Sequence, residues 1–381
     1  MVIVSTEGGA GEDGEPVREE DNFDVEAVHA WLATHAPADA GIGELCRTPE
    51  VRQFSGGASN LTYLLSYGER EMILRRAPPG AKAASAHDMA REFRIQRALA
   101  PYYPYVPKMV ALCQDSSVIG NDFYVMERIQ GTILRARIPP ELGLDAPTIR
   151  RLCLSAIDRL VELHQIDPLR AGLADIGKGT GYVRRQVEGW SERYRTARTW
   201  NVPRFERVMH WLAERQPPDI ALRVIHNDYR LDNLVLARDD PQRIVGVLDW
   251  EMATVGDPLM DLGGALAYWV QRDDDRVMRA LRRQPTDAPG MLSRREIVEH
   301  YAQRTGLSID DWVFYEVFGL FRLATIIQQI YRRYHLPQTR NPAFRHPHGR
   351  GHLAGRACPR PSGAWQRRCA GLLDRGGHPH P

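Results

Sequence analysis

The clearest pattern of hydrophobic and polar positions in the chain is a pair of apolar segments joined by a polar turn. Residues 224–236 and 244–250 are rich in Val, Ile and Leu, and the stretch between them contains Arg, Asp, Pro and Gln. This pattern predicts a β-hairpin. Because the first residue of one antiparallel strand lies beside the last residue of its partner, we expect Asn233 and Asp249 to meet at one end of the hairpin. Asp228 is then expected on the loop that leads into that end.

Hydrophobic periodicity along the rest of the chain predicts an α+β protein. Short apolar runs before residue 130 predict a small antiparallel sheet with one main helix, and longer helical patterns predominate after residue 145. The predicted strands cover 51–65, with a Gly-Gly turn inside, 71–75, 106–112 and 123–127. The predicted helices cover 24–34, 87–100, 148–165, 181–200, 293–306 and 312–335.

Composition changes at both ends of the chain. Residues 1–22 carry seven acidic residues against one Arg, which predicts a disordered acidic segment. Residues 341–381 are rich in Gly, Pro, Arg and His, and we expect this tail to be poorly ordered as well. Between these ends we predict an N-terminal lobe over residues 23–128 and a C-terminal lobe over residues 129–340.

Charge, cysteine content and hydropathy exclude several classes of protein. The net charge is only +2 and the basic excess lies in the tail, which argues against a nucleic-acid partner. The five cysteines show no C-x-x-C spacing and no zinc-type pairing with His, so we expect a reduced, cytoplasmic protein. The first residues lack an apolar core, and no apolar run approaches 18 residues. These observations predict neither a signal peptide nor a membrane span.

The predicted end of the hairpin has the residue types needed for phosphoryl transfer. The side chains of Asn233 and Asp249 offer hard oxygen ligands of the kind that Mg²⁺ accepts beside nucleotide phosphates. Asp228, on the adjacent loop, is placed to accept the proton of an attacking hydroxyl. Asp and Asn are also ordinary turn residues, and for a single such residue that interpretation would be preferred. Several of them at these spacings, between two apolar strands, favour the catalytic interpretation.

These residues carry a family resemblance. HNDYRLDN at 226–233 and LDWEMATVGDPLMDLG at 248–263 resemble the aminoglycoside-phosphotransferase and choline-kinase branch of the protein-kinase-like fold. They look most like the phosphotransferase domain that is fused to some acyl-CoA dehydrogenases. The resemblance implies a bilobal fold, a nucleotide-binding N-terminal lobe, ATP and Mg²⁺ as cofactors, and a hydroxyl group as acceptor. It also implies that Asp261 holds the catalytic loop through backbone N–H groups.

The Gly-Gly turn inside residues 51–65 is a candidate phosphate loop. Glycines allow backbone N–H groups to approach a phosphate closely, although Gly-Gly between strands is also an ordinary hairpin turn, and the segment lacks the GxGxxG spacing of protein kinases. Its position ahead of the catalytic hairpin favours the phosphate loop. The residues assigned to nucleotide contact here are Ser55, Gly56, Gly57, Ser59 and Asn60.

The strand at 71–75 and the helix at 87–100 are expected to supply a second nucleotide contact. Protein kinases place a Lys on this strand, whereas this chain offers Arg75 and Arg76. We assign Arg75 to the phosphates and Glu92 as its helical partner, the alternative being that both arginines form a solvated edge. By resemblance, the backbone around Glu127 and Arg128 is the hinge that pairs with adenine.

Charge in the second lobe bears on the acceptor. The helix over 181–200 interleaves Arg with Tyr and Trp, which predicts either an amphipathic helix with solvated arginines and buried aromatics or an anion-binding wall. Arg322 interrupts the apolar run of the last helix, which suggests a buried pair or a ligand contact, and His164 is expected to be a core residue. An aminoglycoside is a polycation, so this charge favours an anionic acceptor. The resemblance to dehydrogenase-linked kinase domains implies that the acceptor is a hydroxyacyl-CoA or a hydroxy acid. The alternatives are an antibiotic phosphotransferase and an ATP-binding regulatory pseudokinase. The family resemblance also suggests a functional link to an acyl-CoA dehydrogenase.

Overall fold

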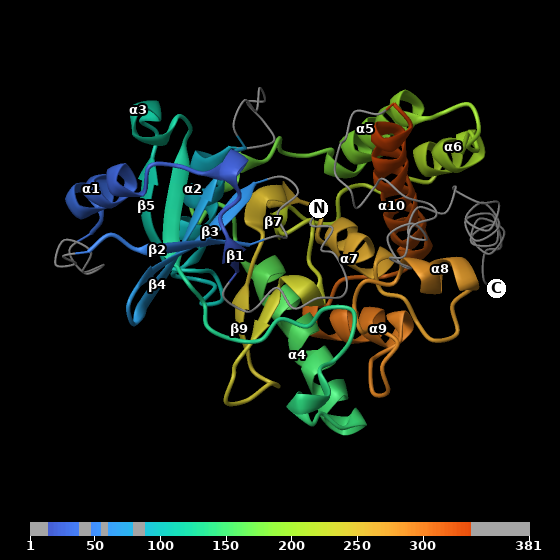
Figure 1. Cartoon of the computed structure of the whole chain (residues 1–381). Helices are drawn as coiled ribbons and strands as arrows, with labels where there is room; N and C mark the ends of the chain where they lie inside the picture. Colours follow the sequence, from blue (N-terminus) through green and yellow to red (C-terminus); the bar gives the residue numbers. More distant parts are fainter. Residues whose placement is uncertain (1–13, 38–46, 55–59, 79–87, 337–381) are drawn as a thin grey trace. The chain divides into compact units, whose positions relative to one another are not determined.

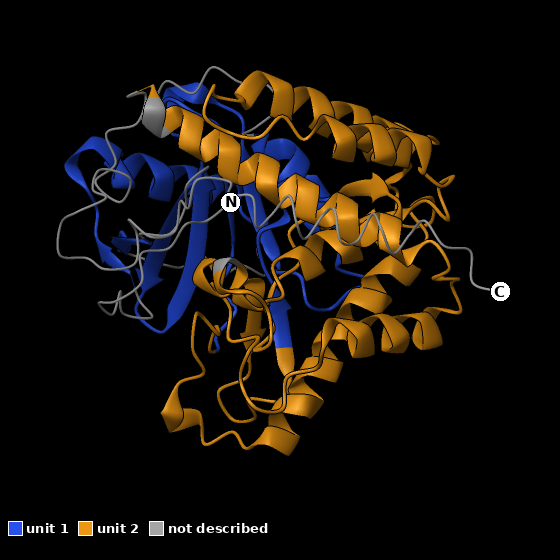
Figure 2. Ribbon diagram, turned by 90° about the vertical axis from the view of Figure 1, so that its right-hand side faces the viewer, with its two compact units in different colours: residues 1–131, 245–253 blue, residues 132–244, 254–381 orange. Residues whose placement is uncertain are grey.

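The computed structural model describes residues 14–37, 47–54, 60–78 and 88–336 (Figure 1). The chain forms two compact units, which Figure 2 colours separately. Unit 1 comprises residues 1–131 and 245–253, and unit 2 comprises residues 132–244 and 254–381. The fold is a mixed α+β architecture, as the sequence predicts.

Unit 1 is built on a six-stranded antiparallel sheet with strand order β1-β2-β3-β4-β6-β5. β3 and β4 run side by side over their full lengths, from the pair Leu61 and Arg76 to the pair Tyr67 and Arg70. The strands are β1 (Glu15–Pro16), β2 (Glu50–Gln53), β3 (Leu61–Tyr67), β4 (Arg70–Arg76), β5 (Met109–Cys113) and β6 (Phe123–Glu127). The helices are α1 (Val25–His35), α2 (Met89–Leu99) and the short α3 (Ser116–Ile119).

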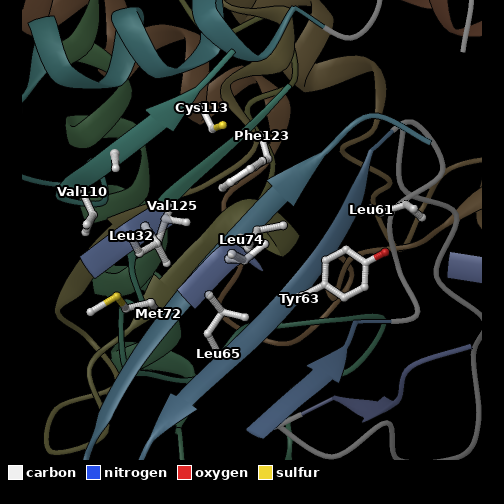
Figure 3. Close-up of a cluster of buried hydrophobic side chains, with 12 residues drawn as sticks. Leu32, Leu61, Tyr63, Leu65, Met72, Leu74, Val110, Cys113, Phe123 and Val125 are labelled. Carbon is white, nitrogen blue, oxygen red and sulfur yellow. The ribbon is translucent and has the colours of Figure 1, made fainter. Parts of the chain in front are cut away.

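Alternation along the strands divides the core of unit 1 between the two faces of the sheet. Successive side chains of a strand point to opposite faces, so Leu65 and Leu74 pack with Leu32 of α1, whereas Leu64 and Ile73 pack in the cluster that contains α2. Figure 3 shows the first of these clusters. Arg75 lies two residues after Ile73 on β4, so its side chain points to the same face of the sheet, which is the face that α2 covers.

The N-terminal segment corrects one prediction. Residues 14–22 are ordered rather than disordered, because β1 pairs with β2 and Asp21 is buried. Gln53 donates to Asp21 Oδ2 over 2.8 Å, and Arg76 donates through Nη2 to the Asp21 carbonyl oxygen over 2.6 Å. Local composition gave no sign of these contacts, since both partners lie far along the chain. Residues 1–13 and the tail after residue 336 lie outside the described residues.

Unit 2 is mainly helical, and the helices predicted from periodicity are all present. Its core is formed where α10 packs against α7 and α5, and where α4 packs against α9. β8 (Leu234–Leu236) and β9 (Ile244–Val247) form a two-stranded hairpin, with residues 245–247 of β9 counted in unit 1. The hairpin is shorter than predicted, because β7 (Arg223–Ile225), at the start of the predicted first strand, pairs with β10 (Thr254–Gly256) instead. The helices are α4 (Ala146–Gln165), α5 (Tyr182–Ala197), α6 (Glu206–Glu214), α7 (Pro258–Ala267), α8 (Arg276–Leu281), α9 (Arg294–Thr305) and α10 (Trp312–His335).

α10 is long and apolar. Within the described part of the chain it is the one helix that could cross a membrane by length and composition, over Trp312–Arg333. In the structure, 67% of its most apolar window is buried. Its partners are α7 and α5, so the apolar surface of α10 forms the core of unit 2.

Candidate active site

The loop over residues 226–233, which we call the catalytic loop, is held by Asp261 of α7. Asp261 Oδ2 accepts from the His226 backbone N–H over 2.7 Å, and Oδ1 accepts from the Asn227 N–H over 2.8 Å. α7 begins at Pro258 after the N-cap Asp257, whose side chain accepts from the N–H groups of Leu259 and Met260. The cap fixes the first turn of α7, and with it the place of Asp261. This is the loop-holding role that the resemblance implies.

A buried network ionises and orients Asp261. His164 of α4 lies with Nε2 3.0 Å from Asp261 Oδ2 and Nδ1 2.7 Å from the Tyr301 hydroxyl. Burial by itself would raise the pKa of Asp261, but the hydrogen bond and charge of His164, together with His226, lower the pKa below its ordinary value. His164 is thus a core residue, as predicted, and it also supports the catalytic loop through Asp261.

Asp228 and Asn233 meet on the catalytic loop. Asn233 Nδ2 donates to the Asp228 carbonyl oxygen over 2.9 Å and to Asp228 Oδ2 over 3.3 Å. Arg230, which the sequence analysis did not assign, places Nε 3.3 Å from Asp228 Oδ1 and 3.4 Å from Asp232 Oδ1. Burial raises the pKa of Asp232, and Arg230 opposes that rise. Asp228 therefore lies in a compact cluster with an amide, a guanidinium and a second acid.

Asn227, immediately before Asp228, has a left-handed backbone with φ 63°. Arg322 of α10 donates through Nη2 to its carbonyl oxygen over 2.7 Å, and the Tyr182 hydroxyl donates to its Oδ1 over 3.2 Å. The isolated charge at 322 therefore bonds a backbone carbonyl of the catalytic loop, whereas the sequence suggested an ion pair or a ligand contact. Three elements, α5, α7 and α10, fix this one residue.

Unit 1 holds the second group of predicted site residues. Arg75 donates through Nη1 to Glu92 Oε1 over 2.5 Å, as predicted, and its Nη2 lies 3.3 Å from Asp249 Oδ1 and 3.6 Å from Glu251 Oε2. Burial raises the pKa of Glu92, and the Arg75 guanidinium opposes that rise. Arg75 is therefore part of a buried cluster of charges, and the alternative of a solvated edge is wrong for it. Arg76 is buried on the opposite face of the sheet.

The predicted phosphate loop lies mainly outside the described residues. Ser55, Gly56, Gly57 and Ser59 fall there. Asn60 is described, is buried, and donates through Nδ2 to Glu251 Oε2 over 3.2 Å.

Glu251 thus links Asn60 to Arg75. The sequence analysis missed it, although its place two residues after Asp249 was a usable signal.

At the predicted hinge, two backbone N–H groups are already bonded within unit 1. The Glu127 N–H donates to the Lys108 carbonyl oxygen over 2.9 Å, and the Arg128 N–H donates to that of Glu71 over 3.3 Å. Any contact between adenine and this segment would therefore use other backbone groups. The hinge assignment stays a prediction.

The two predicted metal ligands belong to different units, Asn233 to unit 2 and Asp249 to unit 1. Their meeting at one end of the hairpin therefore stays a prediction. Among the described residues, no group of three or more His, Cys, Asp or Glu side chains is arranged to hold a metal ion.

The fold of unit 1 and the catalytic loop of unit 2 define a small-molecule phosphotransferase of kinase-like architecture. The chain belongs to the phosphotransferase enzyme family, APH, whose family model matches residues 50–297.

Curated relatives extend well beyond this chain. Acyl-CoA dehydrogenase family member 10 of Mus musculus is 37% identical over 287 residues, which cover 74% of this chain and 26% of the relative. Member 11 of Homo sapiens is 33% identical over 333 residues, covering 86% of this chain and 42% of the relative. The chain thus spans less than half the length of these curated relatives.

Solved structures agree with the family. One is a Ralstonia eutropha JMP134 protein described as an aminoglycoside phosphotransferase, which is 32% identical to this chain and has a TM-score of 0.72. The match covers 91% of this chain and 98% of the R. eutropha chain. Choline kinase of Cryptosporidium parvum shares the fold, with 13% identity, a TM-score of 0.53, and coverage of 93% of this chain and 95% of the kinase.

Proposed function

We propose that this protein transfers the γ-phosphoryl group of ATP to the hydroxyl of an anionic small molecule, with a hydroxyacyl-CoA or a hydroxy acid as the acceptor class. Asp228 accepts the hydroxyl proton while the acceptor oxygen bonds to the γ-phosphorus and the bond to the β-phosphate oxygen breaks. Arg75, paired with Glu92, offsets phosphate charge. The observation that carries the proposal is the Asp228–Asn233 pair on a loop held by Asp261.

The donor set of the two predicted metal ligands fits Mg²⁺. Asn233 directs its amide NH₂ to Asp228, so its carbonyl oxygen is the atom that remains for a cation. Asp249 contributes carboxylate oxygens, and both types are hard ligands. Bound Mg²⁺ would neutralise charge on the nucleotide phosphates.

The acceptor is inferred from charge and from the relatives. Arg322 and the exposed arginines of α5 belong to unit 2, as the catalytic loop does, and a polycationic acceptor would meet repulsion there. The curated relatives are named as acyl-CoA dehydrogenase family members, which supports an acyl-linked acceptor and a functional link to such a dehydrogenase. The name of the R. eutropha protein favours the second candidate, an aminoglycoside acceptor. Turnover of 4-hydroxyoctanoyl-CoA against kanamycin tests this choice, and a clear preference for kanamycin contradicts the anionic acceptor.

Substitution of Asp228 tests the mechanism. Asp228→Asn preserves the shape of the side chain and removes its basicity, so we expect kcat to fall by about 10²- to 10⁴-fold while the KM for ATP changes little. The control is Asp239→Asn, because Asp239 is an exposed acid of the same unit that pairs with Arg243 in the hairpin turn. An unchanged kcat in Asp228→Asn would overturn the assignment of the base.

A further inference from the structure

Trp190 of α5 contacts two arginine side chains of unit 2. The guanidinium carbon of Arg193 lies 4.9 Å from the centre of the Trp190 ring, and that of Arg322 lies 5.4 Å from it. Trp190 and Arg322 are each 8% exposed, whereas Arg193 is exposed on the helix surface. One aromatic ring therefore connects a cation open to solvent with a cation that is buried.

Neither guanidinium has an acidic partner within the described part of the chain. Arg195, two residues further along α5, shows the contrast, because it pairs with Glu206 over 3.1 Å. Two like charges at one ring repel each other, and a cation–π contact at a surface offsets only part of that cost. An anion bound beside Arg193 would supply the missing counter-charge.

The buried end of this arrangement reaches the catalytic loop. Arg322 donates to the carbonyl oxygen of Asn227, the residue before Asp228. Its guanidinium also lies against α7, since a Cβ built on Gly264 would be 2.7 Å from Arg322 Nη1. The Arg322 guanidinium is therefore held by the Trp190 ring, the Asn227 carbonyl oxygen and the close approach of α7.

We propose that Arg193 binds an anionic group of the acceptor and that two residues act as positioning residues: Trp190 holds the Arg193 guanidinium, and Arg322 holds the Asn227 carbonyl oxygen before Asp228. The proposal rests on the proposed function and adds the residue that selects the acceptor. The anion recognised is a phosphate or a carboxylate, since a guanidinium pairs with either. In a CoA thioester the phosphates lie on the carrier, whereas in a free hydroxy acid the carboxylate lies on the acceptor itself.

Arg193→Gln separates charge recognition from chemistry. With 4-hydroxyoctanoyl-CoA as probe, we expect its KM to rise by about tenfold, the loss of one charge-assisted contact, with kcat and the KM for ATP unchanged. With the uncharged pantetheine thioester of the same acid, the KM should not change. A second pair of probes, 4-hydroxyoctanoate and its uncharged methyl ester, tests in the same way whether Arg193 recognises the carboxylate. The matched control is Arg195→Gln, which removes an exposed charge from the same helix and should leave every KM unchanged.

The pattern across the probes decides the proposal. A KM penalty restricted to the charged member of either pair supports it and identifies the anion. An equal KM for wild type and Arg193→Gln on both charged probes overturns it, as does an equal penalty on charged and uncharged probes. If wild-type protein phosphorylates none of the probes nor kanamycin, the proposed function fails instead, so the two failures are distinguishable.

Arg322 gives the second readout. Arg322→Gln should lower kcat for charged and uncharged probes alike, by about tenfold or more, because the Asn227 carbonyl loses a charged donor. Arg322→Lys, which keeps the charge, should recover part of that kcat. Thermal denaturation of both variants checks that they fold. A folded Arg322→Gln variant with wild-type kcat overturns the positioning role.

Discussion

At the scale of single residues, the site is marked by backbone positions that cost free energy. Asn227 and Asp249 have φ of 63° and 69°, a region that side chains other than Gly enter at a cost of about 1–3 kcal/mol. For Asn227 the structure shows what holds it there, since Asp261, Arg322 and Tyr182 bind its N–H, its carbonyl and its side chain. These three contacts offset the cost, and they fix the direction in which the chain enters Asp228.

His164→Leu should weaken this support in a pH-dependent way. The folded-state pKa of Asp261 is lowered, so this group stabilises the fold above its unfolded pKa of about 3.9, and that stability is lost as the pH falls through the folded pKa. Without His164 the pKa of Asp261 rises, so the loss begins at a higher pH. We expect the free energy of unfolding to fall by about 1–3 kcal/mol at pH 7 and further toward pH 5, measured by urea denaturation.

The conservative variant His164→Gln serves as the control, because an amide can still donate to Asp261 and accept from Tyr301. It should recover most of the lost stability, and the acidic limb of its kcat profile should lie between those of wild type and His164→Leu. Superimposable pH profiles for all three proteins would contradict the role given to the imidazole.

Sequence alone predicted some of these residue-level contacts and not others. The Arg75–Glu92 pair and the grip of Asp261 on the catalytic loop were predicted from motif positions and are present. The contact of Arg322 with a backbone carbonyl was not, because an isolated charge in an apolar helix does not reveal which distant backbone group faces it. Glu251 was missed although it stands two residues after Asp249, because its partners Asn60 and Arg75 lie about 190 and 175 positions away in the chain.

At the scale of elements, the parity of β4 decides which arginine can serve the nucleotide. Adjacent residues of a strand face opposite sides, so Arg75 reaches α2 and Arg76 reaches Tyr63 and the Asp21 carbonyl on the other face. The sequence favoured Arg75 only through its resemblance to related phosphotransferases, because β4 contains the consecutive apolar residues Met72, Ile73 and Leu74 and so shows no alternation that would reveal its faces. The ordering of residues 14–22 was not readable, because a two-residue strand depends on its pairing with β2 rather than on its own pattern.

The crossing of α7 and α10 depends on glycine. A Cβ built on Gly319 would lie 2.2 Å from the Gly263 carbonyl oxygen, which is backbone and cannot rotate away. Gly319→Ala should therefore destabilise the protein by about 1–3 kcal/mol, through forced separation of the two helices, as measured by urea unfolding.

Gly189→Ala on α5 is the matched control for that substitution. There a Cβ would meet only the tip of the Arg193 side chain, and alanine is the better helix former, so stability should stay equal or rise by about 1 kcal/mol. An equal loss in both variants would show that helix packing is not the cause.

At the scale of the whole molecule, the division into units does not follow the chain in order. Residues 245–253 belong to unit 1, although the residues on both sides of them belong to unit 2. The sequence predicts a lobe boundary near residue 128, where composition and pattern change, but contains no local signal for this later segment. Such a segment is assigned by contacts with distant strands and helices, which local periodicity does not record.

The two proposed magnesium ligands, Asn233 and Asp249, belong to different units. Whether they bind one cation can be tested by replacing them singly and together. ATP with Mg²⁺ should raise the melting temperature more than ATP alone. If Asn233 and Asp249 hold one cation together, replacing either residue should remove most of this additional rise. Replacing the other residue as well should then remove little more. In a double-mutant cycle of Asn233→Ala and Asp249→Ala, we therefore expect a coupling free energy of about 1 kcal/mol or more in Mg²⁺ affinity. Independent sites would instead give additive losses within about 0.5 kcal/mol, and additivity in variants that still bind ATP would exclude a shared cation.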